Sequence, residues 1–325
     1  NKKDMELFAG QRIDRTTIDK IFIEKSGLIA IHGWDENFNF KPDLKLLIDG
    51  ENIPINEFHR IYRPDVAEAL KLENRFLGFS CEFLINKSLK NSCLEVILNE
   101  QKILSKTVTR EIFTPAYSTL LNESNVKHRE DIYGYGPPAE YVAGDILDLV
   151  KLSIDTQDKV LDFGCGRGNI VNFLRTQGTK AFGIELETPL IQQALLPECK
   201  QFIQLYSGNF PLPYRDEEFD RVLAIEVIEH IPEYYQAIQE IHRICKETFI
   251  MSVPDASAIP RCYHQNVVPW HLLESTHFNF FTEKSLRNVL SKFWGKITFI
   301  KVGQVNINDT GFKNSIVAVC EKKYH

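Results

Sequence analysis

The chain has 325 residues, 43% of them hydrophobic, so it can form one large domain or two ordinary ones with a substantial core. Its net charge is −6, from 38 Lys and Arg against 44 Asp and Glu, and its pI is about 5.9. This balance argues against a dedicated nucleic-acid or membrane-surface binder, because both need clustered positive charge. No apolar run of about 18 residues occurs, so no membrane-spanning helix is predicted.

The seven cysteines indicate a reducing compartment. They are odd in number, scattered, and never form a C-x-x-C pair. Neither a disulfide framework nor a Cys-rich zinc site is expected, and we interpret them as free thiols of a cytoplasmic protein. The first ten residues are polar and lack the apolar segment of a signal peptide. Asn1 is not an initiator methionine, so whether the chain is a piece of a longer protein stays open.

Residues 1–112 predict a β-rich domain. Residues 1–12 are expected to be a frayed end. Apolar runs of strand length then alternate with turn residues, which indicates a small sandwich or barrel. Asp49-Gly50, between two such runs, indicates a hairpin, and one helical interruption begins at Pro64. The clearest predicted strands are 18–23, 28–34, 44–48, 79–85 and 94–98.

Short motifs in this first half are similar to the non-catalytic β-rich modules of bacterial and viral polysaccharide-biosynthesis enzymes. These motifs are Gly33-Trp34, Ile48-Asp49-Gly50, the run RPDVA at 63–67, and Gly78-Phe79. The resemblance implies a carbohydrate-related accessory domain, while a scaffold or dimerisation role stays equally open. Trp34 and Tyr62 could stack on a sugar ring, although aromatic residues in small β domains more often belong to the core.

Residues 113–138 are predicted to be a linker or a lid. Thr114-Pro115 and the run GYGPP at 134–138 break regular structure. Tyr133 and Tyr135 stand beside glycines just before the first helix of the second domain, so the segment could fold over a cofactor. A simple connection between domains explains the same residues, and both interpretations stay open.

From residue 139 to residue 325, helical and strand patterns alternate, which indicates a mostly parallel sheet with helices on both faces. A helix is predicted at 139–152 and another at 282–292. The chain then ends in two strands joined without a helix, which indicates a terminal antiparallel hairpin. The predicted strands are 159–163, 180–184, 202–205, 219–224, 248–253, 297–302 and 315–320.

The run VLDFGCGRG at 160–168 is the most informative motif of this half. An apolar strand leads into glycines at alternate positions, and the residues at 169–177 then read as a helix. Glycines suit this turn because a side chain would hold the backbone away from a ligand, and because some turn positions need positive φ. The motif therefore predicts a strand, a tight ligand-binding turn and a helix.

A second apolar run ends in Glu185, seventeen residues after Gly168. An acid at this position of a doubly wound sheet binds ribose hydroxyls. The G-x-G-x-G spacing differs from the dinucleotide pattern G-x-G-x-x-G, and VLDFGCGRG resembles the first motif of class I S-adenosylmethionine-dependent methyltransferases. The resemblance covers residues 133–325 and implies an α/β, Rossmann-like, seven-stranded sheet with S-adenosylmethionine as cofactor.

This resemblance implies a set of cofactor-binding positions. The glycine turn would hold the methionine part, Asp162 its amino group, and Glu185 the ribose. Asn209 and Phe210, after the third strand, would contact the adenine. Acids suit this pocket because the cofactor carries a sulfonium cation and an ammonium group. The predicted cofactor-binding residues are Asp162, Gly164, Cys165, Gly166, Gly168, Glu185, Leu186, Asn209, Phe210 and Glu226.

Glu226-Val-Ile-Glu229-His230 follows the fourth strand. If this turn is helical, the two acids and the imidazole share one face, where they could bind Mg²⁺ or Mn²⁺. Similar E-x-x-E-H patterns occur in ubiquinone-biosynthesis and small-RNA 2′-O-methyltransferases, in which a further histidine completes a metal site; His277 stands at the matching place. The predicted catalytic residues are Glu229 and His230, and the predicted metal ligands are Glu226, Glu229, His230 and His277.

A metal-free site stays open, since many methyltransferases of this broad group carry E-V-x-E-H without a metal. His264 and His271 are weaker candidates for the further ligand. A hydroxyl acceptor must lose its proton during attack on the methyl group, and either His230 or a metal would assist. The amide-acceptor pattern N/D-P-P-Y is absent at 224–227, which reads AIEV. The sequence therefore favours an oxygen acceptor.

We expect a cytoplasmic S-adenosylmethionine-dependent O-methyltransferase that acts on a sugar hydroxyl in glycan or polysaccharide biosynthesis. A small-molecule acceptor such as a quinone or catechol, an RNA 2′-hydroxyl, and a non-catalytic glycan-binding module on a retained fold stay open as alternatives. The expected partners are a saccharide or a small molecule, with neither a membrane nor nucleic acid. The oligomeric state is not predicted.

Overall fold

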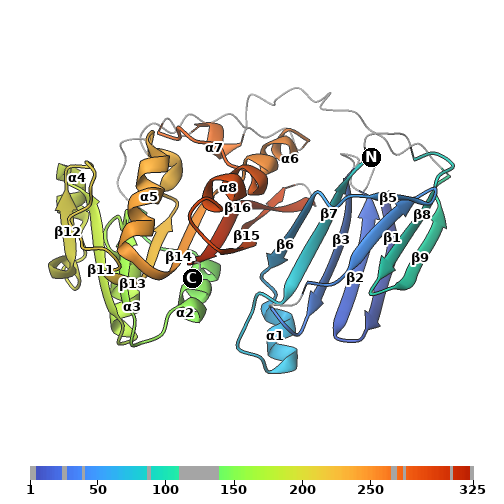
Figure 1. Cartoon of the computed structure of the whole chain (residues 1–325), viewed down its shortest axis with the longest axis horizontal. Helices are drawn as coiled ribbons and strands as arrows, with labels where there is room; N and C mark the ends of the chain where they lie inside the picture. The colour runs from blue at the N-terminus through green and yellow to red at the C-terminus, as the bar shows by residue number, and fades with distance from the viewer. Residues whose placement is uncertain are drawn as a thin grey trace. The chain divides into compact units, whose positions relative to one another are not determined.

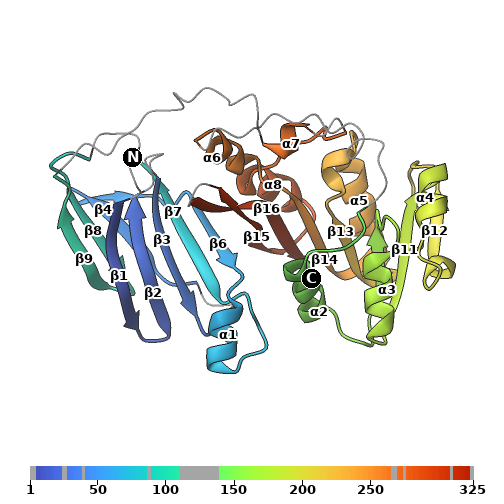
Figure 2. The ribbon, with the colours of Figure 1, turned by 180° about the vertical axis from the view of Figure 1, so that it is seen from behind.

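The computed structural model of the chain describes residues 5–23, 28–38, 41–85, 89–109, 139–264, 269–273, 276–307 and 310–322. The chain divides into two compact units, 1–118 and 119–325 (Figures 1 and 2). The expected linker or lid at 113–138, with Tyr133 and Tyr135, lies outside the described residues.

The first unit is a β-sandwich. One antiparallel sheet has the order β1-β2-β3-β7-β6 and the other β5-β4-β8-β9. Ile31 and Phe79 of the first sheet share one buried core with Leu46 and Val96 of the second, as the sequence predicted. The strands are β1 (Met5–Ile13), β2 (Thr16–Ile23), β3 (Leu28–Asp35), β4 (Leu44–Ile48), β5 (Glu51–Ile53), β6 (Glu57–Ile61), β7 (Gly78–Leu84), β8 (Cys93–Leu98) and β9 (Gln101–Thr107), with helix α1 (Pro64–Leu70) between β6 and β7.

The start of this unit corrects one expectation. Residues 1–12 are not simply a frayed end, because the strand from Met5 to Ile13 pairs with β2 along its length and buries Ile13. The hairpin at Asp49-Gly50 is confirmed: Ile48 pairs with Glu51, and both turn residues have positive φ, which a two-residue hairpin needs.

The two aromatic residues proposed for sugar stacking pack within their own unit. The guanidinium carbon of Arg12 lies 5.5 Å from the centroid of the half-buried Trp34 ring. The Tyr62 ring lies 5.2 Å from the Phe76 ring. Glycan binding by this unit stays a prediction.

The second unit contains a seven-stranded sheet over its described residues, in the order β15-β16-β14-β13-β10-β11-β12. Strands β10 to β14 run parallel, and β16 joins them antiparallel through a hairpin with β15, as predicted. The strands are β10 (Lys159–Phe163), β11 (Lys180–Leu186), β12 (Ile203–Tyr206), β13 (Phe219–Ile225), β14 (Cys245–Pro254), β15 (Lys296–Ile307) and β16 (Thr310–Glu321).

Helices cover both faces of this sheet: α5 and α8 face the viewer in Figure 1, and α2 and α3 in Figure 2. The α-helices are α2 (Gly144–Ser153), α3 (Asn169–Thr176), α4 (Pro189–Ala194), α5 (Tyr234–Ile244), α6 (Ile259–His264), α7 (Trp270–Leu273) and α8 (Glu283–Leu290). Short 3₁₀ turns are η2 (Lys200–Phe202), η3 (Ile228–His230) and η4 (Ala256–Ala258). Among the described helices, none has the length and apolar character needed to cross a membrane.

The first helix of this unit begins later than the sequence pattern predicted. It starts at Gly144 rather than at residue 139, and Tyr141 is largely exposed. The apolar face that the helix buries, Ile146, Leu149 and Val150, begins only in its first turn. Residues before Gly144 therefore bury no stripe of side chains that would stabilise further helical turns.

Candidate functional site

The glycine turn joins β10 to α3 at the carboxyl edge of the sheet. Gly164, Gly166 and Gly168 have φ values of +73°, +55° and +97°, which L side chains rarely adopt. A Cβ atom on Gly164 would lie 2.5 Å from Val227, and one on Gly168 would lie 2.6 Å from Ile203. Close packing against Val227 and against Ile203 of β12 therefore favours glycine at these two positions, in addition to the backbone conformation.

Glu185 closes this turn from the end of β11. Its carboxylate accepts hydrogen bonds from the backbone N–H of Gly166 and of Leu186, each at 2.7 Å. Burial raises the pKa of Glu185, and these two bonds partly offset that effect. The carboxylate is thereby placed beside the turn, where the sequence predicted a ribose-binding acid.

Asp162 lies buried in β10. Burial raises its pKa well above the usual value, and the negative charge of Glu185 raises it further. No cationic side chain of the described residues lowers either pKa. Two buried acids that lack a cation fit a positively charged ligand, and S-adenosylmethionine carries two positive groups that would lower both pKa values.

The other predicted cofactor residues surround this edge. Cys165 is buried with its Sγ atom against Gly183, so only its backbone is available at the turn. Leu186 is 45% exposed and lies against Gly208. The exposed Asn209 amide donates to the Ser207 hydroxyl at 3.1 Å. Phe210 packs against the core of the unit. Their cofactor contacts stay predictions.

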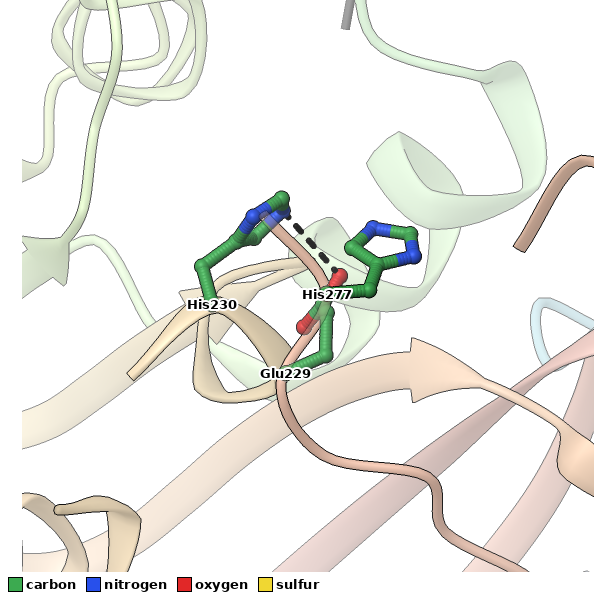
Figure 3. Close-up of side chains that lie close together, drawn as sticks. All are labelled: Glu229, His230 and His277. Atoms are coloured by element: carbon green, nitrogen blue, oxygen red, sulfur yellow. Dashed lines mark ion pairs between the residues drawn. The ribbon is translucent and has the colours of Figure 1, made fainter. Parts of the chain in front are cut away.

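A second group of side chains lies after β13. Glu229 and His230 of η3 meet His277 from the loop before α8, with one ligand atom of each within 4.8 Å of the others (Figure 3). Glu229 is almost fully buried, and neither carboxylate oxygen has a hydrogen-bond donor among the described residues. One of these oxygens lies 3.7 Å from His230 Nε2. We call these three residues the histidine cluster.

The loop that carries His277 is bound to η3 by Asn279. The Asn279 side chain donates to the carbonyl oxygens of Ile228 at 3.0 Å and Ile231 at 2.6 Å. The backbone N–H groups of Phe278 and Asn279 donate to the Glu229 carbonyl at 2.8 and 3.1 Å. These four bonds hold His277 beside Glu229. Sequence reasoning missed Asn279, because nothing local marks a loop residue whose partners are 48 and 51 positions away.

Each imidazole of the cluster has its Nδ1 atom engaged by a neighbour. His230 Nδ1 lies 2.8 Å from Thr276 Oγ1, and His277 Nδ1 lies 3.0 Å from the carbonyl oxygen of His271. The His271 ring also packs against His277, with centroids 4.5 Å apart. Burial lowers the pKa of His271 to about 4, so this imidazole is neutral at pH 7. The side chain of His264 lies outside the described residues.

Glu226 takes a different position from the predicted shared helical face. It leaves β13 with φ +53°, so the following 3₁₀ turn does not continue a helix from it. Its carboxylate accepts a hydrogen bond from Ser315 at 3.0 Å, and its N–H lies 3.1 Å from Ser252 Oγ. Burial raises the pKa of Glu226 to about 7. The ligand atoms that lie within 4.8 Å of one another are those of Glu229 and the two histidines, and a metal role for Glu226 stays a prediction.

The glycine turn and the histidine cluster lie at the same edge of the sheet. Strands β10 and β13 are parallel neighbours, with Asp162 opposite Leu223. Val227, two residues before Glu229, packs against Gly164 of the turn. A ligand bound at the turn would therefore lie next to the cluster, which is the usual place for ligands in a doubly wound sheet.

Comparisons with known proteins agree with this geometry. Residues 138–293 match the family model described as a methyltransferase domain. An uncharacterised protein of Methanocaldococcus jannaschii is 38% identical over 33% of this chain and 45% of its own length. The O-methyltransferase resE of Aspergillus sclerotiorum is 29% identical over 34% of this chain and 45% of its own length. A ubiquinone biosynthesis O-methyltransferase of Pseudomonas syringae is 33% identical over 27% of this chain and 40% of its own length.

The chain spans less than half the length of each of these curated relatives. The matched region contains β10 to β14, the glycine turn, Glu185 and the histidine cluster, and its sheet ends in the antiparallel β15–β16 hairpin. The second unit of this chain is therefore a class I S-adenosylmethionine-dependent methyltransferase domain.

Proposed function

We propose that this chain transfers a methyl group from S-adenosylmethionine to a hydroxyl group of a sugar, in glycan or polysaccharide biosynthesis. The observation that supports this most is the arrangement of two buried acids at the glycine turn beside a carboxylate-imidazole cluster at the same sheet edge. The first group suits a cationic methyl donor, and the second suits an acceptor that must lose a proton.

When bound, S-adenosylmethionine supplies an electrophilic methyl group on a good leaving group. The protein then has to align donor and acceptor and to exclude water. Glu185, which already accepts bonds from Gly166 and Leu186, would also accept the ribose hydroxyls. Asp162 would face the amino group, and its buried carboxylate would gain the positive charge that it lacks.

The histidine cluster would activate the acceptor. His230 Nε2 would take the hydroxyl proton, and Glu229 would balance the imidazolium charge that forms. A divalent ion held by Glu229, His230 and His277 would lower the pKa of the same hydroxyl. One carboxylate and two imidazoles fit Mn²⁺ better than Mg²⁺, which prefers oxygen ligands. The Glu229 oxygens, which accept no hydrogen bond from another described side chain, are consistent with such an ion.

The oxygen acceptor is supported by two relatives that are named O-methyltransferases and by the cluster itself, which offers the base or metal that a hydroxyl acceptor needs. The sugar is supported by the resemblance of the first unit to polysaccharide-biosynthesis modules and by the net charge of −6, which disfavours RNA. A vicinal diol of a sugar would also chelate a metal at the cluster.

A planar small molecule such as a catechol or a quinol is the second candidate acceptor. Phe278 and Phe280 are 58% and 46% exposed on the loop that carries His277. The Phe280 ring packs at a tilt against His271, with centroids 4.3 Å apart. Aromatic rings at this position would pack against an aromatic acceptor as well as against the apolar face of a sugar.

Calorimetric titration with S-adenosylhomocysteine tests the cofactor half of the proposal, first with EDTA and then with Mn²⁺ or Mg²⁺. A transfer assay with labelled S-adenosylmethionine then compares oligosaccharides with catechols. Micromolar binding and transfer to a sugar would support the proposal. Transfer only to catechols would replace the sugar, and transfer to RNA would replace both. Absence of binding would contradict the cofactor assignment itself.

A further inference from the structure

The two imidazoles of the histidine cluster are held in the same way. Each has its Nδ1 atom against an oxygen of the segment that precedes His277: Thr276 Oγ1 for His230 and the His271 carbonyl for His277. In His230 the other ring nitrogen, Nε2, is the atom nearest to the Glu229 carboxylate, at 3.7 Å. Figure 3 shows the ion pair between His230 and Glu229, with the His277 ring beside them.

A neutral imidazole carries its proton on one nitrogen and a lone pair on the other. His277 Nδ1 lies 3.0 Å from the His271 carbonyl oxygen, which only accepts hydrogen bonds, and 2.5 Å from His271 Nδ1, which can donate or accept. A proton on His277 Nδ1 satisfies the carbonyl and leaves the lone pair on Nε2. A base or a metal ligand at His230 Nε2 needs the same arrangement, with the proton on Nδ1.

We propose that Thr276 is a positioning residue, whose hydroxyl accepts the Nδ1–H of His230 and so keeps a lone pair on His230 Nε2 toward Glu229. The proposal rests on the proposed function, because it assigns how that function's base or ligand is prepared. The hydroxyl also fixes the ring plane, which places Nε2 toward the acceptor. Residues that orient a working histidine through its second nitrogen typically change metal affinity or activity by about 10- to 100-fold when removed.

Thr276→Val tests this, because valine keeps the shape of threonine and removes the hydroxyl. Thr276→Ser keeps a hydroxyl at this position and is the conservative variant. Thr176→Val is the control, because it removes a threonine hydroxyl at the end of α3, outside the cluster. Long-range ¹H–¹⁵N correlation spectra of ¹⁵N-histidine-labelled full chain, in EDTA with S-adenosylhomocysteine, report the tautomer of each of the nine histidines. His230→Ala identifies the signals of His230.

We expect His230 to carry its proton on Nδ1 in the wild-type chain, in Thr276→Ser and in Thr176→Val. In Thr276→Val, a substantial fraction should move to the Nε2–H form. The transfer rate, or the Mn²⁺ affinity if the metal is required, should fall about 10- to 100-fold in this variant and recover in Thr276→Ser. The dissociation constant for S-adenosylhomocysteine should change less than twofold.

Two results would overturn the proposal: a wild-type His230 that already carries its proton on Nε2, or an unchanged tautomer in Thr276→Val. The spectra separate this from failure of the proposed function. If the wild-type chain shows the Nδ1–H form of His230 but binds no S-adenosylhomocysteine in calorimetry, the proposed function fails while the role of Thr276 in holding the imidazole stands.

Discussion

The two halves of the site are assembled in different ways. The cofactor half comes from a short stretch, Asp162 to Gly168, together with Glu185 at the end of the next strand. The histidine cluster joins η3 to a loop 46 residues later, and the Asn279 side chain holds the two together. A local motif can therefore specify the first half, whereas the second exists only after the domain has folded.

The halves share one electrostatic feature. Each buries a pair of acids, Asp162 with Glu185 and Glu226 with Glu229, and burial raises the pKa of all four. Repulsion within each pair raises the pKa of Asp162 and of Glu229 further. A bound cation would favour the charged forms in both places. We therefore expect a substitution in one half to change either cofactor binding or methyl transfer and to leave the other unchanged.

The largest effect should come from the cluster. His230→Ala should lower the transfer rate by about 10²- to 10⁴-fold, the range of general acid–base catalysis, while S-adenosylhomocysteine affinity stays within about twofold. Rate assays and calorimetry on the same preparation measure both quantities. Full activity in His230→Ala and in His277→Ala would remove the base and the metal proposals together.

Glu185→Ala should produce the converse result. It removes the carboxylate proposed to accept both ribose hydroxyls, and a hydrogen bond to a charged group contributes about 1.5–3 kcal/mol, so the affinity for S-adenosylhomocysteine should fall by about 100-fold or more. Calorimetry measures this loss. Glu187→Ala, next to it in sequence and hydrogen-bonded to Gln192 on the surface, is the matched control and should keep wild-type affinity. Equal affinities in the two variants would contradict the ribose assignment.

Asn279→Ala tests whether the cluster depends on its long-range anchor. Loss of two side-chain hydrogen bonds should lower the transfer rate by about tenfold and leave cofactor affinity unchanged, because the two partners of Asn279, Ile228 and Ile231, lie outside the glycine turn. Asn279→Asp should behave alike, since a carboxylate cannot donate to the two carbonyls. The exposed Asn288→Ala on α8 serves as control. Loss of cofactor affinity instead would show that the two halves are not separable.

The smallest effect concerns pH and stability. In the folded state the pKa of Glu226 is raised from 4.5 to about 7, so the folded state holds this proton more tightly than the unfolded state does. Its stabilising contribution is therefore complete below about pH 4.5 and is lost as pH rises through 7. Glu226→Gln has no carboxyl group to ionise at this position, so this loss of stability should not occur in the variant. Between pH 5 and pH 8 its melting temperature should therefore rise by a few degrees relative to that of the wild type. Thermal scans without ligand measure the difference, and a constant offset would contradict the buried acid.

Patterns of a few residues predicted much of the fold. Alternating apolar runs predicted the strands of both units, and Asp49-Gly50 predicted its hairpin, because side-chain periodicity and turn conformation are local properties. The strand at Met5–Ile13 was missed, since the polar runs NKKD at 1–4 and GQR at 10–12 resemble a free terminus and the stability of the strand comes from pairing with β2. The late start of α2 was missed for a similar reason, because a helix end depends on what it packs against.

The sequence by itself determined the glycine turn and its acid, because positive φ at Gly164, Gly166 and Gly168 is a requirement of each residue alone. Only the tertiary structure decided the histidine cluster. The i, i+3, i+4 spacing predicted a helical face, but Glu226 turns away to Ser315, and Asn279 and Thr276 supply the contacts that hold His277 and His230. Their partners come from other elements of the sheet edge, and no short sequence pattern records which distant loops will meet there.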